Sequence, residues 1–153
     1  MTDRDEALYP GMVKVELRDG EYVETLWAAE TEVAGQFRLD NNPFFAYRVS
    51  AGDIVEAVEE APGFFRFVRV VQPSGNRTMR IAFEDFEADA PQAQQILEGI
   101  VALGCDFEGA YGRTISVNIP PNVDLDDAAH FLTEAGVRWE YANPTYDDLH
   151  PTG

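Results

Sequence analysis

The first half of the chain alternates apolar and polar residues over short stretches, which is the pattern of half-buried β-strands. Val13, Val15 and Leu17 alternate with charged residues. The Asp19-Gly20 pair that follows favours a tight hairpin turn. Further strands are predicted over residues 22–28, 36–39, 54–58 and 64–71, and an apolar run at 44–47 brings the expected number to five or six. Residues 8–73 therefore predict a small antiparallel β-sheet or barrel.

From residue 74 the pattern changes to strands that alternate with helices. Met79, Ile81 and Phe83 share one face of a predicted strand. Residues 93–101 show helical spacing, with Asp89 as the expected N-cap and Gly104 at the end.

The remaining elements complete a recognisable order. A strand pair is expected over 106–110 and 113–119, followed by a helix that Asp124 caps and a final strand over 137–141. The resulting order β-α-β-β-α-β predicts a ferredoxin-like half over residues 74–143, so the whole chain is expected to be α+β. The polar, proline-punctuated segment 144–153 is expected to be a loose tail.

Length and composition indicate an ordinary globular protein. The chain has 153 residues, of which 45% are hydrophobic, and this is enough to bury a core without disulfides or metals. Its start is charged, and no stretch approaches the roughly 20 apolar residues of a membrane span. The single cysteine, Cys105, forms no internal disulfide. We therefore expect a cytoplasmic protein with no membrane association.

The net charge of −17, from 28 acidic and 11 basic residues, is the most distinctive bulk property. Nucleic-acid binding depends on Lys and Arg that release counterions from phosphates, so no direct nucleic-acid partner is expected. The same charge would steer a basic protein partner toward the chain. The competing interpretation is that the acidity only provides solubility or adaptation to a salty cytoplasm.

The residues with catalytic chemistry do not form a convincing catalytic set. Asp126 and His130 are four residues apart on the second predicted helix, which favours a surface pair. The acidic neighbours Asp106 and Glu108 disfavour a reactive thiolate at Cys105. We predict no catalytic residues, no cofactor and no enzymatic activity.

Two acidic clusters are candidate interaction sites. Asp124, Asp126 and Asp127 are explained by the start of a helix, where negative charge is favourable. The cluster at Glu84, Asp85 and Glu87 has no such explanation, and we predict that it contacts a basic partner. Neither cluster has the spacing of a calcium loop, so no metal site is predicted.

A second candidate site is polar and lies where the two halves meet. The segment 73–78 is dense in hydrogen-bonding groups, and its glycine turn could hold an anion in backbone N–H groups. The alternative is a structural connection whose side chains satisfy buried backbone groups. The predicted lining of this polar pocket is Asp40, Asn41, Asp53, Arg77 and Thr78.

Four motifs in order carry a resemblance to a known family. They are Glu24-Thr25-Leu26-Trp27-Ala28, residues 39–45 (LDNNPFF), residues 50–53 (SAGD) and residues 73–78 (PSGNRT). In these motifs the chain resembles an uncharacterised bacterial family, the domain of unknown function 4265. The resemblance implies membership but no activity, so it assigns no functional residues.

These observations lead to two hypotheses of different classes. The first is an acidic cytoplasmic binding protein that masks a basic surface of a partner protein, and its sharpest version is an immunity protein that neutralises a toxin. The second is a small-ligand binder or enzyme that uses the polar pocket between the two halves. A third hypothesis is that the chain is a structural or self-associating domain.

Overall fold

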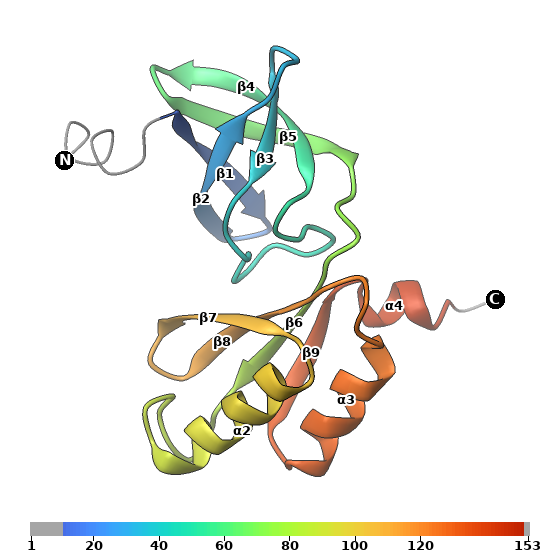
Figure 1. Cartoon of the computed structure of the whole chain (residues 1–153). Helices are drawn as coiled ribbons and strands as arrows, with labels where there is room; N and C mark the ends of the chain where they lie inside the picture. Colours follow the sequence, from blue (N-terminus) through green and yellow to red (C-terminus); the bar gives the residue numbers. More distant parts are fainter. Residues whose placement is uncertain (1–10, 152–153) are drawn as a thin grey trace.

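The computed structural model in Figure 1 describes residues 11–151, apart from the side chains of Asp19, Ala110 and Tyr111. The chain has an α+β fold, with two sheets and three short helices among these residues, which confirms the expected class. A five-stranded barrel lies at one end, and a four-stranded sheet with helices on one face forms the other end.

The barrel is a meander of five strands that closes on itself. Its strands are β1 (Met12–Asp19), β2 (Tyr22–Glu30), β3 (Gln36–Leu39), β4 (Ile54–Ala61) and β5 (Phe64–Gln72). Neighbours in sequence pair antiparallel, and a parallel pairing of β1 with β5 closes the barrel. Val15, Leu26 and Val55 are among the buried side chains inside it. Gly20, at φ 63°, provides the turn between β1 and β2.

The apolar run at 44–47 is not a strand. Residues 40–53 form a long loop between β3 and β4, and this loop lies between the barrel and the sheet (Figure 1). The alternating pattern failed here because the apolar side chains pack at the junction, while backbone N–H groups bond to the side chain of Glu24 instead of a neighbouring strand.

The second sheet has the strand order β7-β8-β6-β9, and all of its pairs are antiparallel. Its elements are β6 (Arg77–Ala82), α2 (Pro91–Ala102), β7 (Asp106–Tyr111), β8 (Thr114–Ile119), α3 (Leu125–Glu134) and β9 (Arg138–Asn143). Helices α2 and α3 cover one face of the sheet (Figure 1). The side chain of Arg80 in β6 reaches the loop 40–53, so the opposite face is turned toward the barrel.

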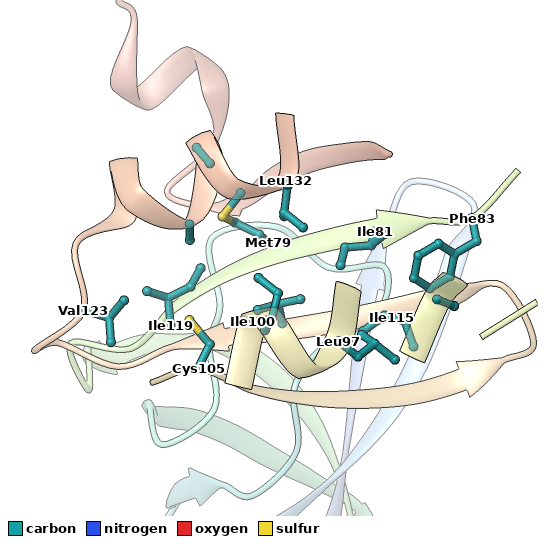
Figure 2. Close-up of a cluster of buried hydrophobic side chains, with 14 residues drawn as sticks. Met79, Ile81, Phe83, Leu97, Ile100, Cys105, Ile115, Ile119, Val123 and Leu132 are labelled. Carbon is teal, nitrogen blue, oxygen red and sulfur yellow. The ribbon is translucent and has the colours of Figure 1, made fainter. Parts of the chain in front are cut away.

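The core between the sheet and the two helices is built mainly from apolar side chains. Figure 2 shows Met79 and Ile81 of β6 between Leu97 and Ile100 of α2 and Leu132 of α3, and all five are at most 3% exposed. The helices approach closely because residue 99 is glycine. A Cβ atom there would lie 2.2 Å from the ring of Phe131 in α3.

The two expected helix caps had different outcomes. Asp124 caps α3 as predicted, and its side chain accepts a hydrogen bond from the backbone N–H of Asp126. The prediction of Asp89 as the cap of α2 is wrong, because Ala90 is the N-cap and makes no side-chain cap. Pro91 at the first helical position starts this helix, since its fixed φ suits a first turn.

The segment after residue 143 is more structured than a loose tail. Tyr146–Leu149 form the short helix α4, in which Thr145 and Asp148 make a reciprocal capping box. Arg48 of the loop 40–53 lies 3.2 Å from the carboxylate of Asp148 and holds α4 against the junction. Within the described residues, no helix has the length and apolar character needed to cross a bilayer.

Candidate functional site at the junction of the barrel and the sheet

The carboxylate of Glu24 in β2 ties the loop 40–53 to the barrel. Its oxygens accept hydrogen bonds from the backbone N–H groups of Phe44, Phe45 and Ala46 at 2.8, 3.0 and 2.8 Å. Hydrogen bonds to an ionised acceptor are stronger than neutral ones. Glu24 therefore determines where the aromatic rings of Phe44 and Phe45 lie.

Asp53 is a second buried anchor, at the other end of the same loop. It is 1% exposed, and its two carboxylate oxygens accept from the backbone N–H groups of Ser50 at 2.9 Å and Ser74 at 2.8 Å. The side chains of Ser74 and Asn76 both donate to the carbonyl of Ala51. The loop that leads into β6 is thereby fastened to the loop that precedes β4.

A chain of hydroxyl and amide groups continues this network into the sheet. The hydroxyls of Ser50 and Thr78 are 2.7 Å apart, and the side-chain amide of Asn143 in β9 donates to Ser50 Oγ at 2.8 Å. Ser50 and Thr78 are fully buried. Buried polar groups that satisfy one another in this way fix the relative position of the elements that bear them.

Glu108 of β7 is a charged residue on the sheet side of the junction. Its carboxylate accepts from the backbone N–H of Asn42 at 2.8 Å. Burial raises the pKa of Glu108, and hydrogen bonds from Asn42 and from the Asn41 side chain oppose the rise. Ser116 of β8 also bonds to this loop, since its hydroxyl donates to the carbonyl of Pro43 at 2.8 Å.

The structure separates the five residues predicted to line a polar pocket. Asp53 and Thr78 share the network around Ser50. Asp40 and Asn41 bond instead to the backbone of Trp27 in the barrel. The guanidinium of Arg77 donates to the carbonyls of Pro120 and Val123, in the loop before α3.

Arg77 reaches that loop because β6 and β8 pair with Arg77 opposite Ile119, one residue before Pro120. The side chains of Ser74 and Asn76 in the motif 73–78 likewise bond to another part of the chain, while the backbone N–H of Asn76 bonds within the motif to the hydroxyl of Ser74. Their role as a ligand-binding set stays a prediction.

A cavity of about 510 Å³ does lie between the two halves, but other residues line it. Its aromatic wall comes from three separate segments of the chain. The lining residues are Gly20, Glu21, Tyr22, Phe44, Phe45, Tyr47, Arg80, Ile81, Ala82, Thr114, Arg138, Trp139 and Glu140. The rings of Tyr22 and Phe45 stack at 5.1 Å between centroids. This size and this lining are typical of ligand or anchor pockets.

Arg80 is the buried cation of this cavity. Its side chain is 5% exposed, and it donates to the carbonyl of Ala46 at 2.6 Å. Its Nε lies 3.3 Å from the carboxylate of Glu140, and its guanidinium lies 4.7 Å from the centre of the Tyr47 ring. The hydroxyl of Tyr47 donates to Glu140 at 2.9 Å, so Arg80, Tyr47 and Glu140 all contact one another.

A second recess, of about 600 Å³, lies beside β9. It shares Tyr47, Trp139 and Glu140 with the first cavity, so the two adjoin. Its remaining lining is Arg48, Tyr141, Thr145, Tyr146, Asp147 and His150. Burial raises the pKa of Tyr141, with a smaller contribution from Asp126. The rings of Tyr146 and His150 stack with 4.2 Å between their centroids and form one wall of this recess.

The predicted acidic face is exposed and borders a third recess. Glu84, Asp85 and Glu87 lie in the connection between β6 and α2, and all three are exposed. Glu84 and Asp85 line a recess of about 340 Å³ whose other lining residues include Phe86, Ile96 and Val137. Arg138 lies 3.6 Å from Glu84 and lines both this recess and the first cavity. The role of the acidic face in binding stays a prediction.

The groups considered for catalysis do not come together. Cys105 is 2% exposed, and burial, together with Asp106, raises the pKa of its thiol. His130 is 76% exposed and lies 3.8 Å from Glu134, rather than pairing with Asp126. Within residues 11–151, no three His, Cys, Asp or Glu side chains are grouped so that they could hold a metal ion.

Several residues that shape the site were not singled out from the sequence. Glu24 lies within a motif but looks like an ordinary exposed strand position, and Glu108 and Glu140 look like surface charges. Arg80 is the exception, because an arginine between the apolar residues Met79 and Ile81 is a visible signal in the sequence. A buried cation needs a specific partner.

Comparisons with known proteins bear on the family and the fold. The model of the family described as "Domain of unknown function (DUF4265)" matches residues 24–141. No curated protein matches the chain. A structure entitled "Novel crystal structure of a hypothetical protein from Neisseria gonorrhoeae" is 22% identical, with a TM-score of 0.73. The match covers 88% of this chain and 96% of that one, and at this identity it shows similarity of fold alone.

Proposed function

This chain belongs to the DUF4265 family, a domain of unknown function, and we propose that it is a binding protein that masks a basic surface of a partner protein. The proposal takes it to be non-enzymatic and cytoplasmic. A net charge of −17 would accelerate association with a basic partner. An immunity protein that neutralises a basic toxin is the most specific form of the proposal.

The recess at Glu84 and Asp85 is the observation that supports this proposal. Its acidic residues are exposed, and Phe86, Ile96 and Val137 give it an apolar portion. A Lys or Arg side chain has an apolar stem and a charged head, so the stem would pack on the apolar part while the head meets a carboxylate. A surface that only provided solubility would not need an apolar recess beside the charges.

The experiment begins with a pulldown of the partner from the native host. Association of the purified partner is then followed by stopped-flow mixing at two salt concentrations. Neutralising Glu84, Asp85 and Glu87 as Glu84→Gln, Asp85→Asn and Glu87→Gln should slow association and flatten its salt dependence, because peripheral charges act mainly through steering.

A matched control removes the same amount of charge from the barrel. Glu32→Gln, Glu59→Gln and Glu60→Gln change three exposed carboxylates that lie outside the recess. This control should slow association much less. Equal slowing in both triple variants would mean that only total charge matters, and the absence of a basic partner in the pulldown would leave the acidity as a solubility trait.

A second candidate function is binding of a small ligand, with or without chemistry, in the cavity between the two halves. The observation in its favour is the aromatic cavity of about 510 Å³ that also holds Arg80. The network of Asp53 and Thr78 would then support the loop that shapes the cavity. A fragment screen read by amide chemical shifts tests this function, and shifts confined to the lining residues would favour it.

We also propose that residues 74–143 have the ferredoxin-like arrangement. The order β6-α2-β7-β8-α3-β9 and the sheet order β7-β8-β6-β9 support it, together with two helices on one face. An experimental structure compared with known ferredoxin-like domains would test this assignment. A different connection between β6 and β7 would remove it.

A further inference from the structure

Strand β9 is an outer strand of the sheet. It pairs with β6, with Tyr141 opposite Met79 and Trp139 opposite Ile81. Over Arg138–Tyr141 no strand of the described chain, residues 11–151, pairs with its other edge. An edge strand presents backbone N–H and C=O groups that another strand can bond.

The recess of about 600 Å³ lies along this edge and not above one face of the sheet. Trp139 belongs to the helical side, since its indole N–H is 3.3 Å from the hydroxyl of Thr133 in α3. Glu140 belongs to the barrel side, where it accepts from Tyr47. Because side chains from both faces of β9 line the recess, the recess borders the strand's own edge.

The recess has walls on either side of the edge and a defined end. Tyr47 lies on the barrel side, and α4 supplies Tyr146 on the other. Beyond Tyr141 the edge is already occupied, because Ala142 bridges to Thr145 and its carbonyl accepts from the backbone N–H of Arg48 at 2.8 Å. An added strand would therefore pair along Arg138–Tyr141 and stop there.

We propose that the outer edge of β9 takes an extended, basic segment of the partner protein as an added strand. This inference rests on the proposed function and specifies how the partner binds. Alternate side chains of an added strand point to opposite sides, so one set would contact the rings of Trp139, Tyr141 and Tyr146. Backbone hydrogen bonds would supply affinity, and the rings would select aromatic or β-branched side chains.

Charge decides between a basic segment and a second copy of this chain. Asp147 is exposed and lines the recess, where Glu140 is already paired with Arg80 and Arg48 is already paired with Asp148. Two copies would bring together two molecules that each carry −17, which opposes pairing of β9 with β9. A segment with Lys or Arg in alternate positions meets no such repulsion.

The surface between this edge and the acidic face is continuous. The recess beside β9 shares residues with the cavity between the halves, and that cavity shares Ala82 and Arg138 with the acidic recess. One partner can therefore place an extended segment against β9 and a further basic side chain near Glu84. This continuity links the edge strand to the surface of the proposed function.

The test is a selection from a display library of random peptides of about twelve residues, with the full chain as the target. Peptides of this length are long enough to pair along four residues of a strand. We expect enrichment of Lys and Arg alternating with aromatic or β-branched residues. A synthetic copy of a selected peptide should slow amide hydrogen exchange roughly tenfold or more at alternate residues of 138–141. Contacts through side chains alone would not protect backbone amides in this alternating pattern.

Matched substitutions locate the site by affinity. Tyr146 is 61% exposed and lines the recess beside β9, whereas Phe107 of β7 is 37% exposed and lines neither this recess nor the adjoining cavity. Tyr146→Ala should weaken binding of the selected peptide by about tenfold, as aromatic anchors do, while Phe107→Ala changes it less than about twofold. Asp147→Lys, at an exposed position, should weaken binding by charge even if Tyr146→Ala disturbs α4.

The outcomes separate this inference from the proposed function. Basic peptides that perturb only residues around Glu84 would overturn strand addition at β9 and leave the proposed function standing. Selection without basic enrichment would overturn both. Protection of β9 in the peptide-free protein, together with a concentration-dependent dimer in light scattering, would identify a second copy as the occupant and overturn the inference.

Discussion

The two sides of the junction between the barrel and the sheet are built in opposite ways. On one side, Asp53, Ser50 and Thr78 bond to one another and to neighbouring backbone, and all three are at most 1% exposed. On the other side, rings from β2, the loop 40–53 and β9 surround open cavities. The side with the densest polar motifs is closed, and the open side is aromatic.

This difference shows what a dense polar motif indicates in this protein. The motif 73–78 and the residues around Asp53 satisfy one another, so they act first as the joint between two sheets. The residues that line open space lie across the joint, where packing leaves cavities. The predictions that follow test this contrast, from the largest expected effect to the smallest.

Asp53→Ala should give the largest loss of stability, about 3 kcal/mol, because it leaves the backbone N–H groups of Ser50 and Ser74 without their acceptor. Urea denaturation measures the change. Asp53→Asn retains one acceptor oxygen and should lose less. If Asp53→Ala were as stable as the natural chain, the closed side of the junction would not be structural.

Glu24→Ala should destabilise the protein by about 2 kcal/mol, since three backbone N–H groups of the loop 40–53 lose a charged acceptor that is only partly buried. The loop carries Phe45 and Tyr47, so the substitution should also alter the cavities. Denaturation gives the stability, and amide shifts of residues 44–47 report the loop. Unchanged shifts would show that the rings hold the loop without Glu24.

Glu108→Gln should produce a smaller effect that depends on pH. Burial raises the folded pKa of Glu108 above its unfolded value of about 4.3, so this group favours folding below that value. The contribution is lost as pH rises through the raised pKa. The amide of Gln can still accept from Asn42 and does not ionise.

The stability of Glu108→Gln relative to the natural chain should therefore increase as pH rises from about 4 toward 7. Urea denaturation of both proteins across this range measures the difference. Exposed Glu98→Gln is the control and should show no such trend. A difference that does not change with pH would mean that folding does not shift the pKa of Glu108.

Tyr22→Ala, on the open side, should cost less than about 1 kcal/mol, because the ring is 60% exposed and loses mainly its stack on Phe45. The comparison with Asp53→Ala is the direct test of the contrast between the two sides. Equal losses in denaturation experiments would show that the aromatic side also holds the halves together.

Asp148→Asn should have the smallest effect, confined to α4. The pKa of Asp148 is lowered by the backbone N–H of Thr145 first and by Arg48 next, so its contribution is present above the unfolded pKa and lost as pH falls through the folded one. Faster amide exchange over Tyr146–Leu149, with an unchanged denaturation midpoint, is the expected result. A shifted midpoint would give α4 a wider structural role.

The sequence by itself determined most of the elements of this fold. The alternation at Val13, Val15 and Leu17 and the helical spacing around Leu97 predict a strand and a helix, because apolar periodicity follows directly from backbone geometry. The cap at Asp124 was also predictable, since a cap uses only local hydrogen bonds. The prediction that Asp89 caps α2 was wrong, because Pro91 starts this helix without a side-chain cap.

Only the tertiary structure decided which residues form the candidate site. Glu24 acts on Phe44 across 20 positions, Arg80 on Ala46 across 34, and Glu108 on Asn42 across 66. No local sequence pattern encodes such pairings, because they depend on how the barrel packs against the sheet. The polar motif was visible in the sequence, but the space beside β9 is left by packing, and packing is a property of the whole chain.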